Sequence, residues 1–150
     1  MGDRTTIFLT LLTSQVKEAE GLLDYLHQRC YEKCIDNTTA FEFEGVNYGN
    51  LEGLAALEEA GIAYESTWEA GHEYDAGTTS VRFTPEGEMV KKTIYVSDLS
   101  IPISDLMRLI NQPEAIFELI KNSNDELQVL PWDNQEEYGK RYRARQLIST

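Results

Sequence analysis

A predicted β-hairpin in the middle of the chain constrains the fold more than any other feature of the sequence. β-Forming residues alternate with polar residues over 79–83 and again over 90–96. Between them lies Thr84-Pro85-Glu86-Gly87-Glu88, in which proline presets one backbone dihedral and glycine supplies another, as a tight turn requires. This pattern favours two neighbouring strands that pair in antiparallel fashion.

The remaining segments mix strand and helix patterns along the whole chain. Further strands are predicted at 6–12, 41–44 and 62–69, with a short one at 127–130. Amphipathic or capped helices are predicted at 14–34, 51–57, 104–110, 113–120 and 133–147. This order predicts an α+β fold with a mixed or mainly antiparallel sheet of about five strands and helices packed on one face. No break in composition divides the chain, so we expect a single globular domain over 1–150 that ends in a basic helix or tail at about 133–150.

The distribution of charge is the strongest functional signal in the sequence. The chain carries 13 basic and 26 acidic residues, a formal charge of −13. Between Lys33 and Arg82 there is no Lys or Arg, although this stretch holds ten Asp and Glu residues. Direct nucleic-acid binding by an acidic face is excluded, because phosphates are neutralised by clustered cations. A negative surface of this kind suits a basic protein partner, or serves only solubility.

The leading hypothesis is therefore a small, acidic, non-enzymatic interaction protein that binds a basic protein surface. Its sharpest form is a DNA mimic that inhibits a nucleic-acid-binding protein, as a counter-defence protein of a phage or mobile element would. Because acids at alternate strand positions share one face, and aromatic residues anchor interfaces, we expect the partner to contact one set of residues. These are Glu42, Glu44, Glu65, Trp68, Glu69, Glu73, Tyr74 and Asp75.

An alternative hypothesis rests on the loop between Glu69 and Gly77. This loop combines His72 with Glu73, two glycines and an aromatic residue. A histidine beside a carboxylate acts as a general base when the acid orients its ring. The alternative is a small-ligand-binding domain or an acid–base enzyme that uses His72 and Glu73. The leading hypothesis assigns no catalytic residue and no cofactor.

Two further groups of residues have a structural and a functional interpretation. His27, Cys30 and Cys34 share one face of the helix predicted at 14–34, where they are candidate zinc ligands or, more simply, buried core residues. The basic residues between Lys140 and Arg145 either contact an anionic partner or pair with the protein's own acids and helix end.

The sequence also bears on the compartment. The most apolar early run, 7–12, is far shorter than the roughly 20 residues of a membrane-spanning helix. Two cysteines are too few for a disulfide scaffold. We therefore expect a cytoplasmic protein without a membrane partner.

Overall fold

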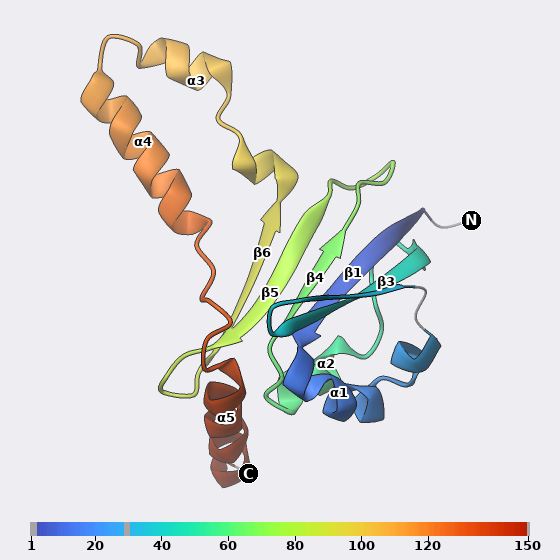
Figure 1. The fold of residues 1–150 in the computed structure, drawn as a ribbon. Helices are drawn as coiled ribbons and strands as arrows, with labels where there is room; N and C mark the ends of the chain where they lie inside the picture. The colour runs from blue at the N-terminus through green and yellow to red at the C-terminus, as the bar shows by residue number, and fades with distance from the viewer. Residues whose placement is uncertain (1–2, 29–30, 150) are drawn as a thin grey trace.

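The computed structural model describes residues 3–28 and 31–149, and it shows an α+β fold built on one six-stranded sheet (Figure 1). The strands lie in the order β2-β3-β1-β4-β5-β6, and every neighbouring pair is antiparallel. Their bounds are β1 (Arg4–Leu12), β2 (Tyr31–Ile35), β3 (Thr38–Asn47), β4 (Tyr64–Trp68), β5 (Gly77–Phe83) and β6 (Met89–Tyr95). The α+β class and the antiparallel sheet expected from the sequence are confirmed.

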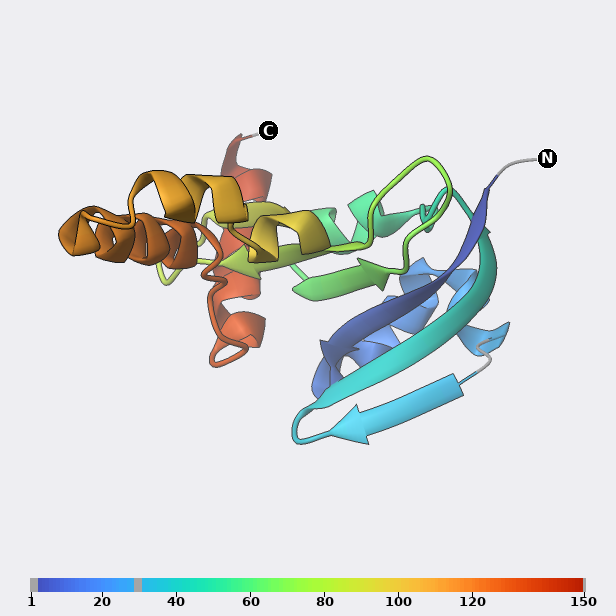
Figure 2. The same cartoon turned by 90° about the horizontal axis from the view of Figure 1, so that it is seen from above.

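Five α-helices accompany the sheet within the described ranges. They are α1 (Val16–Leu22), α2 (Leu54–Glu59), α3 (Ile103–Arg108), α4 (Pro113–Glu126) and α5 (Gln135–Ser149). Short 3-10 turns are η1 (Thr13–Gln15), η2 (Asp24–Gln28) and η3 (Val96–Leu99). The view from above shows that the sheet is twisted, because β1, β2 and β3 are turned relative to β5 and β6 (Figure 2).

The hydrophobic core lies between one face of the sheet, called here the first face, and helices α1 and α2. Side chains alternate along a strand, so Leu9 and Leu11 of β1 and Phe41 of β3 point to the same side. They are fully buried together with Val81 and Phe83 of β5. The helical segments close this core with a few apolar side chains: Ala19, Leu23, Leu26 and Leu57.

The helix predicted over 14–34 is wrong in its second half. Helix α1 ends at Leu22, the short turn η2 follows, and Tyr31–Ile35 forms the edge strand β2, paired with β3. The apolar spacing that suggested one long helix is divided between three elements. Leu23 and Leu26 remain in the core as expected. The residues of β2 instead pair with the edge of β3, because this pairing satisfies backbone hydrogen-bonding groups of both strands. The strand predicted at 127–130 is also absent there, and this segment is a loop.

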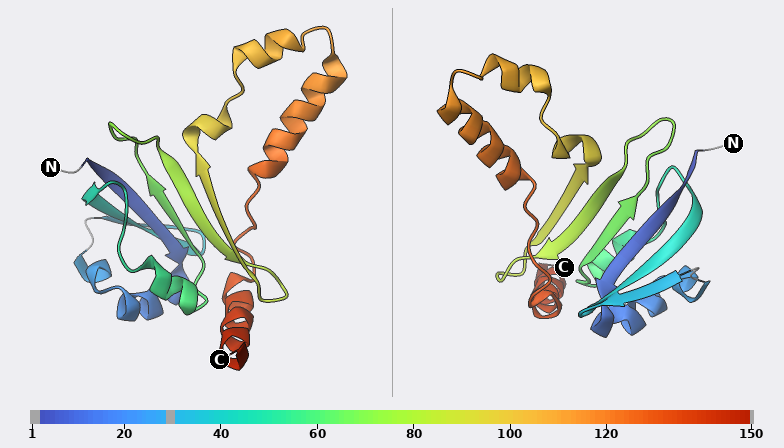
Figure 3. Two further views of the ribbon diagram at one scale, coloured as in Figure 1. Left: turned by 180° about the vertical axis from the view of Figure 1, so that it is seen from behind. Right: turned by 45° about the horizontal axis from the view of Figure 1, so that its top comes forward.

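Helices α3 and α4 form an arm that leaves the sheet at the end of β6, whereas α1 and α2 pack on it. Figures 1 and 3 both show this arm standing clear of the strands. No residue from Glu88 to Asn134 is buried. The arm exposes large apolar side chains, among them Ile103, Met107 and Phe117.

This exposure leads to a prediction about local stability. Amide hydrogens of α3 and α4 should exchange with solvent much faster than those of β1 and β5, because opening the arm exposes little buried apolar surface. Native-state hydrogen exchange read by mass spectrometry checks this expectation. Protection of α4 equal to that of β1 would contradict it, and would show that the arm is covered in solution.

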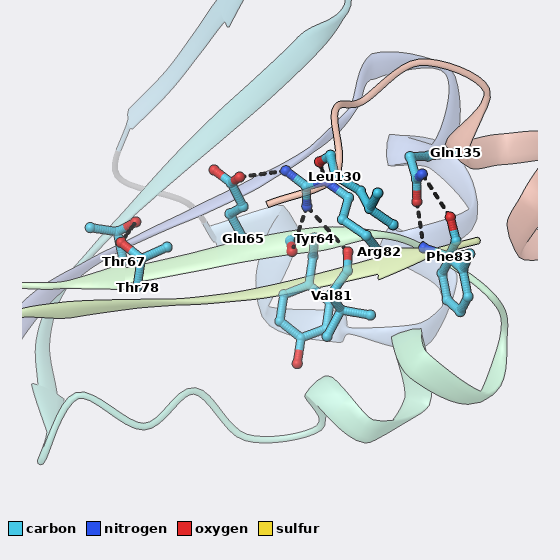
Figure 4. Close-up of polar contacts among 9 residues, drawn as sticks. All are labelled: Tyr64, Glu65, Thr67, Thr78, Val81, Arg82, Phe83, Leu130 and Gln135. Carbon is cyan, nitrogen blue, oxygen red and sulfur yellow. Dashed lines mark hydrogen bonds and ion pairs between the residues drawn. The ribbon is translucent and has the colours of Figure 1, made fainter. Parts of the chain in front are cut away.

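Helix α5 lies across the end of β5 and is fastened by a buried side-chain amide. Gln135 accepts a hydrogen bond from the Phe83 N–H at 2.7 Å and donates one to the Phe83 carbonyl at 3.0 Å. Strand β4 begins at Tyr64, which pairs with Val81 of β5. Phe83, two residues beyond Val81, therefore has no partner in β4. The amide of Gln135 therefore takes the place of a missing strand partner (Figure 4).

The basic residues of α5 bind groups of the chain itself. Arg141 donates to the Pro85 carbonyl at 2.6 Å, and Arg145 donates to the Glu86 carbonyl at 3.0 Å. Arg143 pairs with Glu18 at 3.5 Å. These contacts favour the internal interpretation of the basic tail. Among the described residues, no helix has the length and apolar character needed to cross a membrane.

Candidate functional site

The second face of the sheet, opposite the core, carries two of the predicted acids. Phe8 lies opposite Glu42 on one side and Thr67 on the other. Paired residues and alternate residues point to the same side of a sheet, so Glu42 and Glu65 share this face, as expected. Glu44 follows Glu42 by two positions, at an irregularity in the pairing of β1 with β3.

Glu65 is neutralised by a buried base, Arg82. Arg82 is 2% exposed, and its guanidinium forms an ion pair with Glu65. The same guanidinium donates to the carbonyls of Leu130 at 2.9 Å and Tyr64 at 3.2 Å (Figure 4). It also stacks on the ring of Trp132, 3.6 Å from the ring centroid. Burial lowers the pKa of Arg82, and the neighbouring Glu65 opposes this shift. Glu65 is thus part of an internal network and is poorly placed for a partner.

Several other acids meet at one end of the sheet, where β1 begins and β4 ends. Asp3 accepts hydrogen bonds from the backbone N–H groups of His72 and Glu73, which ties the loop to the first strand. Glu69 is held beside β1, because its N–H donates to the Thr6 carbonyl at 3.2 Å. We call this group the acidic rim; its members are Asp3, Glu44, Glu69, Glu73 and Asp75.

The acidic rim is weakly compensated. Within the described ranges no ion pair joins any of its carboxylates to a base. Arg4 lies nearby, but its guanidinium donates to the Gly45 carbonyl at 3.1 Å. Glu44, Glu69, Glu73 and Asp75 are exposed. Four of the six acids proposed from the sequence as a partner surface therefore belong to the acidic rim, and whether a partner binds there stays a prediction.

His72 is exposed on the same loop, and its backbone N–H donates to the Asp3 carboxylate. A pocket opens next to this loop, and Glu73 and Tyr74 belong to its described lining whereas His72 does not. The two residues of the proposed acid–base pair therefore differ in their surroundings: Glu73 belongs to the pocket wall, and His72 is exposed beside it.

A pocket of about 720 Å³ opens on the first face of the sheet, beside α2. This volume lies within the roughly 300–1,000 Å³ that small-molecule sites occupy. Its walls come from the segment after β3, from α2, from β4 to β6 and from the loop. The aromatic residues that line it are Tyr48, Tyr64, Trp68, Tyr74 and Tyr95.

Trp68 anchors one wall of the pocket. Its indole N–H donates to the Asp75 carbonyl at 2.9 Å. Its ring meets Tyr95 edge to face, with 6.1 Å between ring centroids. Trp68, which the sequence suggested as an aromatic anchor for a partner, is half-buried and lines the pocket. Tyr48 and Tyr95 are more open, with exposed fractions of 51% and 44%.

Glu58 organises the polar part of the pocket. One of its carboxylate oxygens accepts from the Tyr64 hydroxyl at 2.8 Å and from the Lys91 ammonium at 2.8 Å. Burial raises the pKa of Tyr64, and the hydrogen bond to Glu58 raises it further, so the phenol stays protonated. The positive charge of Lys91 is thereby already matched by a carboxylate.

Tyr48, Glu58, Lys91 and Tyr95 are pocket residues that the sequence did not single out. A signal existed for two of them. Lys91, Thr93 and Tyr95 occupy alternate positions of β6, so they share the face of the sheet that holds Tyr64 and Trp68. Their polarity predicts that this part of the first face is not covered by a helix.

The residues considered as zinc ligands are not brought together on a helix. His27 is exposed in η2, and Cys34 is exposed on β2, while Cys30 lies outside the described residues. The shared helix face and the burial of Cys34 were wrong, because the helix ends before either residue. Within the described part of the chain, no three His, Cys, Asp or Glu side chains are grouped to hold a metal ion.

The acidic rim and the aromatic pocket adjoin each other, since Glu73 belongs to both. Together they form the candidate functional site, with a charged outer part and an aromatic inner part. Comparison of the chain with protein-family models, with curated protein sequences and with solved structures finds no match.

Proposed function

We propose that this chain is a non-enzymatic binding protein that attaches to a basic surface of another protein through the acidic rim. The observation that carries the proposal is the position of five acids from separate segments at the end of the sheet where β1 begins and β4 ends: Asp3, Glu44, Glu69, Glu73 and Asp75. Uncompensated like charges destabilise a folded protein by mutual repulsion, and a basic partner relieves that repulsion on binding. Inhibition of a nucleic-acid-binding protein by DNA mimicry is the most specific form of the proposal.

The test compares charge reversal at the acidic rim with charge reversal elsewhere. Glu44→Lys with Glu69→Lys should weaken capture of a basic partner at least about tenfold at 0.1 M salt, because attraction becomes repulsion at exposed positions. The control is Glu114→Lys with Glu118→Lys, at exposed positions of α4 that do not belong to the acidic rim. It changes the net charge by the same amount as the first double variant. This control should leave capture nearly unchanged.

The measurement is quantitative capture from native lysate, with the retained proteins identified by mass spectrometry. Equal loss in both double variants would contradict the proposal, since net charge alone would then explain the attraction. Displacement of the partner by added duplex DNA would support mimicry. A partner that DNA leaves in place would limit the function to a plain acidic interface.

A second candidate function is binding of a small ligand, the alternative that also involved the His72 loop. The pocket on the first face favours it, because Glu73 and Tyr74 of this loop form part of the pocket wall. In this form the loop recognises a ligand, and His72 has no assigned role.

A further inference from the structure

The aromatic pocket has features that select a class of ligand. Tyr48, Tyr64, Trp68 and Tyr95 line a cavity of about 720 Å³. The faces of tyrosine and tryptophan rings carry negative electrostatic potential and attract cations placed within about 6 Å of the ring centroid. Several such rings around one space are the arrangement that recognises alkylated ammonium groups in proteins.

The charges around the pocket also favour a cationic ligand. Glu58 and Glu73 line the pocket together with Lys91, the one base among its described lining residues. The Lys91 ammonium is held at 2.8 Å by Glu58, so its charge is compensated inside the protein. Glu73 is exposed at the pocket wall and has no ion-pair partner among the described residues. The local charge is therefore negative.

The negative charge of the rest of the molecule also favours a cationic ligand. Most of the lining residues belong to the segment 34–81, which contains no Lys or Arg. The chain as a whole carries a formal charge of −13. Such a field raises the local concentration of cations and lowers that of anions. A phosphate or carboxylate ligand would meet Glu58 and Glu73 without a free base to bind.

We propose that the pocket between α2 and strands β4 to β6 binds an organic cation, an alkylammonium group enclosed by tyrosine and tryptophan rings beside Glu73. The same chemistry has two sources, a free amine or a lysine side chain of a protein. The proposal does not require that the acidic rim binds a protein. Tyr48, Tyr95 and Lys91 lie outside the rim, which keeps the two proposals separable.

The test uses choline and its neutral analogue 3,3-dimethylbutan-1-ol, which has the same shape without the charge. Trp68 reports on the pocket by fluorescence in a Trp132→Phe variant, because the chain holds two tryptophans. Choline should bind saturably at the pocket, and the neutral alcohol should bind about tenfold more weakly. Equal affinity for both compounds, or no saturable response to choline, would overturn the proposal.

Two variants locate the binding and separate charge from ring contact. Tyr95→Leu keeps an apolar side chain at an exposed position but removes an aromatic face, and Glu73→Gln removes one charge at the wall. Each should weaken choline binding several-fold. Glu44→Gln is the matched control, because it removes one exposed charge at the acidic rim outside the pocket. Unchanged choline affinity in Tyr95→Leu would overturn the assignment to this pocket.

A second titration distinguishes the sources of the cation. It uses the peptide acetyl-Gly-Lys-Gly-amide and the same peptide with norleucine in place of lysine. Tighter binding of the lysine peptide than of choline would assign the pocket to a side chain of a basic protein, and the reverse order would assign it to a free amine. If choline fails to bind while the charge-reversal variants of the acidic rim still lose their partner, only the pocket proposal is overturned.

Discussion

Gly139→Ala is expected to lower the free energy of unfolding by about 2–4 kcal/mol. Gly139 of α5 faces Gly61 of the turn between α2 and β4, backbone against backbone, and a methyl group on either residue would overlap the carbonyl oxygen of the other. Gly61 is fixed at a φ of 71°, where it ends α2, and α5 is held to Phe83 by the buried amide of Gln135.

Urea denaturation followed by circular dichroism measures this loss. The matched control is Gly21→Ala, because Gly21 lies in α1 and a β-carbon there meets nothing within 4 Å. That substitution should instead stabilise the protein by about 0.5–1 kcal/mol, since alanine favours a helix over glycine. Wild-type stability of Gly139→Ala would show that α5 does not pack on this turn in solution.

Arg82→Met should lower the free energy of unfolding by about 3 kcal/mol or more. The substitution fills a similar volume but removes the buried charge, so Glu65 loses its ion-pair partner. The carbonyls of Leu130 and Tyr64 lose a donor at the same time, and Trp132 loses its stacking partner. Thermal unfolding follows the loss of stability, and tryptophan fluorescence in a Trp68→Phe background follows the change at Trp132.

The control for this substitution is Arg108→Met on the exposed arm. The side chain of Arg108 is 73% exposed in its pair with Asp105, and exposed pairs contribute little. This variant should change stability by less than about 0.5 kcal/mol. Stability of Arg82→Met equal to that of the control would mean that Arg82 is not required for the fold.

Strand periodicity predicted most of the sheet, because alternation of apolar and polar residues reflects the two faces of a strand directly. β1, β3, β4, β5 and β6 all lie where the pattern placed them, and the turn at Pro85 and Gly87 joins β5 to β6. Strand β2 was missed for a physical reason. Its apolar residues continue the spacing of the preceding helix, and only the free edge of β3 makes the extended conformation favourable there.

The candidate site was predicted only in part. Glu69, Glu73 and Asp75 are exposed at the acidic rim, in agreement with their proposed surface position. Glu65 is bound to Arg82, and Trp68 faces the pocket. Local pattern distinguishes exposed from buried positions along one element, but it does not tell which distant side chain will lie opposite. The pairing of residues 65 and 82 depends on β4 and β5 lying side by side.

The sequence by itself determined the α+β class, the alternation of the central strands and the strong negative charge, because each follows from local periodicity or composition. Tertiary structure alone decided which acids are neutralised, how Asp3 joins the loop at His72 to form the acidic rim, and that an aromatic pocket opens beside α2. The physical reason is that these features require contacts between residues far apart in the chain. Such contacts depend on the order of strands in the sheet, which the pattern of any one segment does not contain.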